Sequence, residues 1–426
     1  MYREEQLKAL LEGHRILIAG YGREGRSAET LIQRLLPGAG YAVADGNEQI
    51  ATESAKDCYD MIIKSPGVPM RVLDRDCWPM VTSLTDIFLQ VYGDMTIGVT
   101  GTKGKSTTAS LIHHLLPGSI LAGNIGIPLF DILDELREDS TVVAELSCHQ
   151  LEVLHRSPHV AVLLNLYQEH LDHYDDYMGY KMAKMQIGLH QRPEDHLFWC
   201  ADAAELASLV RSLAMPGVQH PYSLSDITGE ERELLESCPL PGEHNRSNAL
   251  VACRVASLVL CQPLFTLHSQ LSTFHGLRHR LELVGTYRGI IFYNDSISTI
   301  PAATIAALNT LREVDTLILG GFDRGIDYGL LYNYLAAPRA CLRNIIFVGK
   351  AGRRMHDEMS HLHYDPLSRL NAVVIEDDYD TIVRQCYALT APGKICLLSP
   401  AAASYDSFKN FEERGDTFIK LVRKYA

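Results

Sequence analysis

The chain has 426 residues, of which 46% are hydrophobic and 21% charged, a balance typical of a globular protein. Its formal net charge of −13 argues against generic nucleic-acid binding, because a polyanion requires a basic protein face. A chain of this length predicts about three domains. The ten cysteines include no C-x-x-C pair, so we expect a reducing compartment and neither a zinc site nor a disulfide framework.

The N-terminal stretch MYREEQLKALLEGHRILIAG is charged and leads directly into an apolar run. We therefore expect no signal peptide, since such a peptide requires an apolar segment and a cleavage site. No apolar run approaches the roughly 20 residues that span a bilayer. These features predict a cytoplasmic protein without a membrane segment.

Short apolar runs alternate with amphipathic stretches along the chain. The expected strands are residues 15–20, 95–100, 141–146, 159–166, 289–295, 315–321, 344–349 and 394–400. Several are apolar on both faces, as parallel strands between helix layers must be. The pattern predicts an α/β fold with seams near residues 93 and 276, giving domains 1–93, 94–276 and 277–426.

The first domain contains a G-x-G-x-x-G motif at Gly20, Gly22 and Gly25, with Asp45 after the next expected strand. The motif is compatible with a dinucleotide on the helix N-terminus and a ribose on Asp45. It is equally compatible with another diphosphate, or with a turn that binds nothing. Arginines beside the loop could pair with phosphate, and the segment 64–69 (KSPGVP) predicts a tight turn at the same sheet edge.

The segment GVTGTKGKSTT resembles a phosphate-binding loop but has Val99 where the usual G-x-x-x-x-G-K-[ST] pattern has its first glycine. Gly101 and Gly104 can still curl the backbone so that its N–H groups face phosphate. Lys105 supplies a charge for the terminal phosphates, and Ser106 or the adjacent threonine supplies a hydroxyl for magnesium. The apolar strand before and the helix after favour the phosphate-binding interpretation.

Acidic and imidazole groups follow the next two expected strands. Glu145 ends one strand, and Glu169, His170 and Asp172 follow the other, at whose end Asn165 lies. Together they could hold magnesium beside the loop. A helix further on carries Lys181 and Lys184, positions that are most often solvated surface charges.

Seven motifs, in the same order along the chain, resemble those of the Mur ligase family and most closely those of its glutamate-adding members. They are TGTKGKST, ELSCHQLE, NLYQEHLDHY, PGEHNRSNAL, LRHRLE, YNDS and LLSPAAASYDSFKNFEERG, and they span residues 16 to 418 with the first strand included. The resemblance implies three domains. A Rossmann-like N-terminal domain binds a UDP-sugar, a central P-loop mononucleotide-binding domain binds ATP, and a Rossmann-like C-terminal domain closes over ATP and binds glutamate. The family shares the non-standard P-loop.

The resemblance also implies roles for individual residues. The ATP-binding positions are Gly101, Thr102, Lys103, Gly104, Lys105, Ser106, Thr107, Asn245, Asn248, Arg280 and Asp295. The metal positions are Ser106, Glu145, His170 and Lys184, the last as a carbamate, and the catalytic positions are Lys105, Glu145, His170 and Lys184. The UDP-sugar positions are Gly22, Arg23, Glu24, Asp45, Ser65 and Asn124. The glutamate positions are Thr299, Arg324, Ser404 and Phe411.

The implied reaction uses ATP and Mg²⁺ to convert the alanine carboxylate of UDP-N-acetylmuramoyl-L-alanine into an acyl phosphate. The amino group of glutamate then attacks, and phosphate leaves. By the same resemblance we expect a monomer that acts in peptidoglycan precursor synthesis, and domain closure before chemistry because the site residues are distributed over the whole chain.

The chain departs from the family pattern in three places. Ile297 replaces a lysine that many members carry, and Glu24 stands where a small hydroxyl residue commonly touches the diphosphate. Gly46 and Asn47 replace the threonine and arginine that follow the aspartate in other members, which leaves uracil recognition open.

Four other interpretations follow from the same motifs. A related ligase could add L-glutamate instead of D-glutamate. A folylpolyglutamate synthase also joins glutamate to a carboxylate, but a folate does not explain the N-terminal Rossmann-like unit. An NAD-dependent dehydrogenase would leave Lys105, Glu145, His170 and Lys184 without a role. A non-catalytic module would bind nucleotide without turnover.

Overall fold

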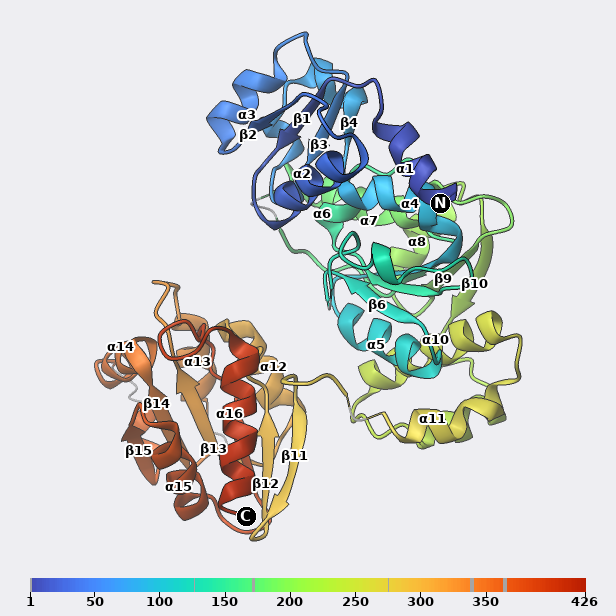
Figure 1. Ribbon diagram of the computed structural model, residues 1–426. Helices are drawn as coiled ribbons and strands as arrows, with labels where there is room; N and C mark the ends of the chain where they lie inside the picture. Colours follow the sequence, from blue (N-terminus) through green and yellow to red (C-terminus); the bar gives the residue numbers. More distant parts are fainter. Residues whose placement is uncertain (1, 126, 171–172, 275, 338–340, 363–365) are drawn as a thin grey trace. The chain divides into compact units, whose positions relative to one another are not determined.

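The computed structural model describes residues 2–125, 127–170, 173–274, 276–337, 341–362 and 366–426. The chain divides into two compact units, residues 1–274 and 275–426. Within the described residues, the strands form three sheets, two in the first unit and one in the second (Figure 1). The predicted α/β class is confirmed, and all eight strands expected from the sequence are present. The assignment of separate functions to residues 1–93 and 94–276 stays a prediction.

The first sheet has the order β2-β1-β3-β4 and is parallel throughout. Its strands are β1 (Ile16–Ala19), β2 (Tyr41–Ala44), β3 (Met61–Lys64) and β4 (Val81–Thr82), and its helices are α1 (Tyr2–Leu11), α2 (Arg23–Leu35), α3 (Asn47–Ser54) and α4 (Leu84–Tyr92). Ile18 of β1 packs in the core that contains α2, while its neighbour Leu17 packs with Ile50 of α3. This alternation is the period of a strand covered on both faces.

The second sheet is parallel with the order β10-β9-β8-β5-β7-β6. Its strands are β5 (Thr96–Thr100), β6 (Ile120–Gly123), β7 (Val142–Glu145), β8 (Val160–Leu163), β9 (His196–Cys200) and β10 (Val218–Tyr222). Its helices are α5 (Lys105–Leu115), α6 (Cys148–Leu151), α7 (Tyr177–Leu189), α8 (Ala204–Ser212), α9 (Gly229–Glu236), α10 (Glu243–Leu260) and α11 (His268–Ser272). The strands β7 and β6 lie on one side of β5 and β8 to β10 on the other, and such a switch point places ligands at its carboxyl end.

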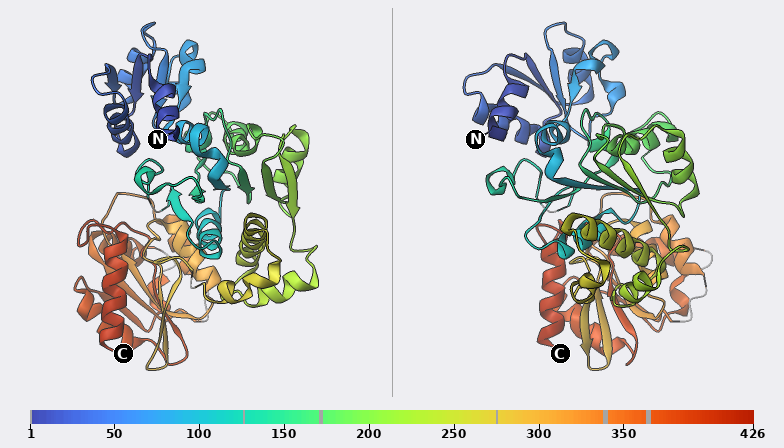
Figure 2. Two further views of the ribbon diagram at one scale, coloured as in Figure 1. Left: turned by 45° about the vertical axis from the view of Figure 1, so that its right-hand side comes forward. Right: turned by 90° about the vertical axis from the view of Figure 1, so that its right-hand side faces the viewer.

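The third sheet has the order β11-β12-β16-β13-β14-β15, with an antiparallel edge strand β11. Its strands are β11 (Glu282–Tyr287), β12 (Ile290–Asn294), β13 (Val314–Gly320), β14 (Asn344–Val348), β15 (Ala372–Ile375) and β16 (Ile395–Leu398). Its helices are α12 (Pro301–Thr310), α13 (Gly329–Ala336), α14 (Gly349–Ser360), α15 (Tyr379–Leu389) and α16 (Phe411–Lys424). Leu317 and Ile318 of β13 belong to different cores, one under α12 to α14 and one under α15 and α16, so helices cover both faces (Figure 2).

Among the described residues, no single helix has the length and apolar character to cross a bilayer. One pair, α10 and the segment Leu264–Ser272, passes that test only when both are taken together, and it is bent by 110° at its break.

Candidate active site

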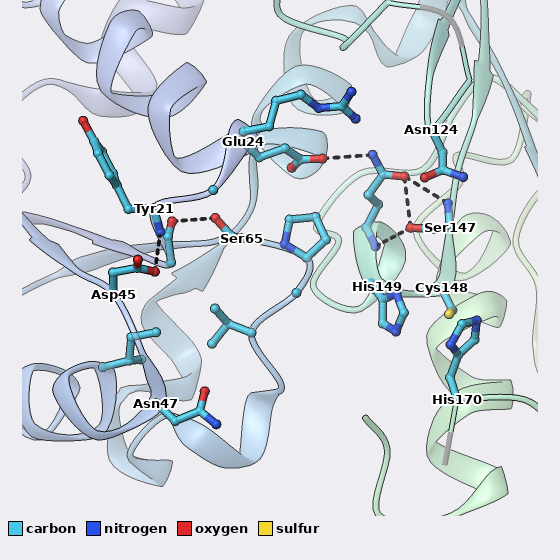
Figure 3. Close-up of a pocket in the computed structure, with 18 of the residues that line it drawn as sticks. Tyr21, Glu24, Asp45, Asn47, Ser65, Asn124, Ser147, Cys148, His149 and His170 are labelled. Carbon is cyan, nitrogen blue, oxygen red and sulfur yellow. Dashed lines mark hydrogen bonds between the residues drawn. The ribbon is translucent and has the colours of Figure 1, made fainter. Parts of the chain in front are cut away.

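A cavity of about 620 Å³ lies in the first unit, where the strands of both its sheets end (Figure 3). From the first sheet it is lined by residues 20–24, 45–47, 50 and 65–68. From the second it is lined by Lys105, Asn124, residues 147–150, Glu169, His170, Tyr180 and Lys184. Side chains from two sheets therefore share one cavity, and this cavity contains every residue predicted for the UDP-sugar.

The glycine loop between β1 and α2 is held in a tight turn. Gly20 has a φ of +90°, and a Cβ on Gly25 would lie 2.1 Å from the Gly20 carbonyl oxygen. The Tyr21 N–H donates to Asp45 Oδ1 at 3.0 Å, and the Ser65 hydroxyl donates to the Gly20 carbonyl at 2.7 Å. Asp45 and Ser65 thus hold the loop in shape while they line the cavity. The tight turn predicted for residues 64–69 is present, and the Val68 N–H donates a hydrogen bond to the Ser65 carbonyl within it.

The P-loop turn has the curl that its two glycines predict. Gly104 has a φ of +86°, which favours glycine, and caps α5, while Asn165 accepts the Lys103 N–H at 2.8 Å. Lys105 donates to the carbonyls of Gly101 and Thr102, both at 3.0 Å, and burial lowers the pKa of Lys105. Ser106 and Thr107 begin the first turn of α5.

Lys184 lies beneath the same turn and is only 2% exposed, so the surface-charge interpretation is wrong for this residue. Its ammonium donates to the Gly101 carbonyl at 3.0 Å and lies 4.9 Å from the centre of the Tyr180 ring. Burial lowers the pKa of Lys184 to about 8, because the interior disfavours the charged form. Lys181, one turn earlier, pairs with Glu205 at 3.0 Å.

Glu145 provides a carboxylate oxygen suited to a cation. Oε1 accepts the amide of Asn124 at 2.9 Å, whereas Oε2 is buried with no hydrogen-bond partner among the described residues. Within those residues, no group of three or more His, Cys, Asp or Glu forms a metal cluster. Mg²⁺ does not need one, because it binds through one or two protein oxygens and takes its remaining ligands from water and phosphate. Glu145 and the hydroxyl of Ser106 fit such a site.

His170 has a φ of +59° and lies among other aromatic rings. Its ring centre is 4.8 Å from that of His149, which in turn lies 4.2 Å from His173. Burial and these neighbouring imidazoles lower the pKa of His149 to about 4, so this ring is neutral near pH 7. The adjacent Glu169 pairs with Lys103. Asp172, which the sequence also indicated, lies outside the described residues.

Asn245 and Asn248 lie beside the P-loop on α10, which packs along α5. A Cβ on Gly104 would lie 2.7 Å from Asn248 Oδ1, so the two segments are in close contact. Asn245 donates to the Pro241 carbonyl at 2.8 Å and lies 3.5 Å from the Asn248 amide. The two ATP-binding asparagines, predicted about 140 positions downstream of Lys105, are therefore adjacent to the phosphate loop.

The second unit contains the predicted Arg280 and Asp295. Arg280 is exposed, whereas Asp295 is 2% exposed and accepts hydrogen bonds from Ser298, Ser399 and the Leu281 N–H. Burial raises the pKa of Asp295 to about 6. The aspartate therefore organises its own loop.

The predicted glutamate residues follow strands of the third sheet. Arg324 donates to the Thr299 carbonyl at 2.7 Å, which joins the loops after β12 and β13. Ser404 is buried, and the backbone of its neighbour Ala403 forms an antiparallel bridge with Phe322 in the loop after β13. The Phe411 carbonyl accepts a hydrogen bond from the Ser296 hydroxyl at 2.8 Å. Ile297 brings no cation to this edge, and its N–H donates to the His279 carbonyl.

Sequence reasoning missed the contacts that join the two sheets of the first unit. Lys64 of β3 is fully buried and pairs with Glu152 at 2.8 Å, and the Gln150 amide donates to Glu24 at 3.2 Å. Both partners lie in the quoted motif ELSCHQLE, but only their position opposite β3 and α2 reveals their role.

The fold and cavity define a P-loop α/β protein in which a second, Rossmann-like glycine loop faces the phosphate loop. The Mur ligase middle domain matches residues 99–256. A UDP-N-acetylmuramoylalanine–D-glutamate ligase of Limosilactobacillus fermentum is 31% identical, with 97% of each chain covered. One of Listeria monocytogenes is 29% identical, with 96% of each chain covered. The chain therefore belongs to the Mur ligase family.

Solved structures show the same fold at lower identity. The UDP-N-acetylmuramate-alanine ligase MurC of Thermotoga maritima superposes with a TM-score of 0.55 at 16% identity, covering 97% of this chain and all of that one. The MurF ligase of the same organism, solved with ADP, gives 0.54 at 15% identity and covers 96% of this chain and 95% of that one.

Proposed function

We propose that the protein is an ATP-dependent ligase that joins D-glutamate to the alanine carboxylate of UDP-N-acetylmuramoyl-L-alanine, in peptidoglycan precursor synthesis. The observation that carries this proposal is the cavity that is lined both by the glycine loop after β1 and by Lys105 of the P-loop. An enzyme that activates a nucleotide-linked carboxylate with ATP needs both loops in one cavity. The names of the full-length relatives support this substrate pair, and the full-length match disfavours a folylpolyglutamate synthase.

In this mechanism the chain's own residues orient the substrates and neutralise their negative charge. The glycine loop after β1 binds the UDP diphosphate, and the backbone N–H groups at the start of α5 bind the ATP phosphates. Lys105, already turned into the loop, offsets negative charge on the transferring phosphoryl group, which is mainly electrostatic work. Glu145, Ser106 and His170 would hold Mg²⁺, which supplies further charge neutralisation when bound.

We further propose that the neutral amine of Lys184 attacks CO₂ to form a carbamate, and that the nitrogen releases one proton as its bond to carbon forms. The nitrogen must first be neutral, and burial favours that form. The product is an anion beneath the P-loop that helps to bind a cation. We propose that glutamate is held by Arg324, Thr299, Ser404 and Phe411. The Arg324 guanidinium suits this role because it can meet a carboxylate with two parallel hydrogen bonds. We also propose a cytoplasmic, monomeric protein.

Phosphate release tests the proposal directly. ATP, UDP-N-acetylmuramoyl-L-alanine and Mg²⁺ are supplied with D-glutamate or with L-glutamate in parallel. We expect turnover with D-glutamate only, and no release when either the nucleotide sugar or glutamate is omitted. Turnover with L-glutamate alone would make Ile297 part of a changed acceptor specificity. An absorbance change with NAD(H) without ATP would favour the dehydrogenase.

A further inference from the structure

Glu24 is the one acidic side chain on the glycine loop that lines the cavity, among the described residues of that loop. It lies in the first turn of α2, whose cap residue Gly22 makes no side-chain capping bond. The first backbone N–H groups of a helix have no partner within the helix, and they form a binding site for anions. A carboxylate at this position would repel the diphosphate that the proposed function places there.

The hydrogen bonds around Gln150 determine which Glu24 oxygen can carry a proton. Gln150 Oε1 accepts the N–H and the hydroxyl of Ser147, at 3.0 and 3.1 Å, which fixes the orientation of the amide. Its Nε2 is therefore the donor toward Glu24 Oε1, at 3.2 Å. Oε1 of Glu24 is thus an acceptor, and only Oε2 is available for a proton (Figure 3).

Oε2 of Glu24 is buried and has no hydrogen-bond partner among the described residues. A buried oxygen without a partner loses free energy unless a ligand satisfies it. No ion pair of the described residues includes Glu24. Arg23 is exposed, and Arg26 turns instead to the Tyr21 carbonyl at 3.0 Å.

The groups that face Glu24 only partly offset the effect of its burial on its pKa. Burial raises the pKa of Glu24, opposed by the Gln150 hydrogen bond and by the charges of Arg23 and Lys64. Lys64 is already paired with Glu152, and His149 of the same cavity is neutral near pH 7. The remaining charged or titratable groups that line the cavity are Tyr21, Asp45, Lys105, Cys148, Glu169, His170, Tyr180 and Lys184. An incoming diphosphate adds negative charge and raises the pKa of Glu24 further.

We propose that Glu24 binds the nucleotide sugar as a neutral carboxylic acid, whose Oε2 hydroxyl donates a hydrogen bond to a non-bridging oxygen of the diphosphate. The inference rests on the proposed function, which supplies this ligand. The proton comes from solvent, so binding takes up as much as one proton per nucleotide sugar. The acid replaces the small hydroxyl donor that the family commonly has at this position. The contact between Glu24 and the diphosphate therefore depends on pH.

Calorimetry with UDP-N-acetylmuramoyl-L-alanine measures this proton directly. The titration is run at pH 7.5 in phosphate and in Tris, because the difference in buffer ionisation heat gives the number of protons taken up. The diphosphate of this ligand is a diester and does not itself titrate near neutral pH. We expect uptake approaching one proton for the wild-type protein and an affinity that falls by as much as tenfold per pH unit through the titration of Glu24.

Two variants isolate the contribution of Glu24. In Glu24→Gln the amide can replace the acid as donor, so we expect affinity within about threefold of wild type at low pH, weaker dependence on pH, and loss of the proton uptake. Glu48→Gln changes an exposed carboxylate in α3 and should retain the wild-type uptake.

Four results would overturn the inference. Equal proton uptake by the wild type and Glu24→Gln assigns the proton to another group. A Glu24→Gln affinity more than tenfold weaker at every pH shows that the carboxylate itself is required. Wild-type protein that binds no nucleotide sugar overturns this inference together with the proposed function, whereas binding without uptake overturns this inference alone.

Discussion

Replacement of Lys184 by alanine is expected to remove nearly all ligase activity. With its ordinary pKa of 10.5, a lysine is about 0.1% neutral at pH 7.5, whereas a pKa of about 8 makes it about 24% neutral. Burial beneath the P-loop therefore increases the reactive neutral amine about 240-fold. That increase is the structural reason for proposing a carbamate at this lysine and not at an exposed one.

The effect is measured by phosphate release and by carbon-13 NMR. Loss of a charged group that acts on the transferring phosphoryl group costs about 10²- to 10³-fold in kcat, and we expect a loss of this size for Lys184→Ala. Short carboxylic acids such as acetate should restore part of the activity by occupying the vacated space. Wild-type protein in ¹³C-labelled bicarbonate should give a carbamate signal that Lys184→Ala lacks.

Lys181→Ala provides the matched control, because it removes a lysine from the same helix that pairs with Glu205 at 3.0 Å. It should retain activity within about twofold and keep the carbamate signal, because the ion pair lies outside the cavity and Glu205 is solvent-exposed. Full activity of Lys184→Ala without added acid would refute the reasoning. So would a carbamate signal that persists in that variant.

Three further expectations concern other positions. Lys105→Ala should abolish phosphate release while UDP-sugar binding stays measurable by calorimetry; loss of both would contradict separate roles for the two loops. Gly104→Ala should lower the free energy of unfolding by about 1–2 kcal/mol in urea titrations, because φ at this position is +86° and a Cβ would contact Asn248. An unchanged unfolding midpoint would exclude this strain. Asp295→Asn should change the pH dependence of stability. The folded protein holds a proton on Asp295 that the unfolded chain releases between about pH 4 and 6, so this residue's contribution falls by about 3 kcal/mol as pH rises through that window. Wild type and Asp295→Asn with parallel stability curves from pH 4 to 7 would show that Asp295 does not titrate in this way.

Local patterns predicted most of the fold. The apolar runs that became β5, β7, β8 and β13 are apolar on both faces, and this property by itself indicates strands between helix layers. The P-loop and the glycine loop were likewise identifiable, because each needs its glycines at short, fixed spacing. Their geometry is a property of a few consecutive residues.

The departure at Glu24 shows what local patterns leave open. The sequence identified an acid on a loop that commonly carries a hydroxyl residue, but not its protonation state. That state depends on the Gln150 amide, 126 residues away, and on how deeply the carboxyl is buried. The same holds for Lys184, whose helix pattern resembles that of an exposed lysine.

The sequence by itself determined the strand and helix order, the two phosphate-type loops and the family, since these depend on residue type and short spacing. Only the tertiary structure decided that loops of two sheets share one cavity, that Lys184 lies beneath the P-loop, and that Glu24 meets Gln150. The physical reason is that burial, and therefore pKa, arises from segments brought together across the chain, which no local pattern encodes.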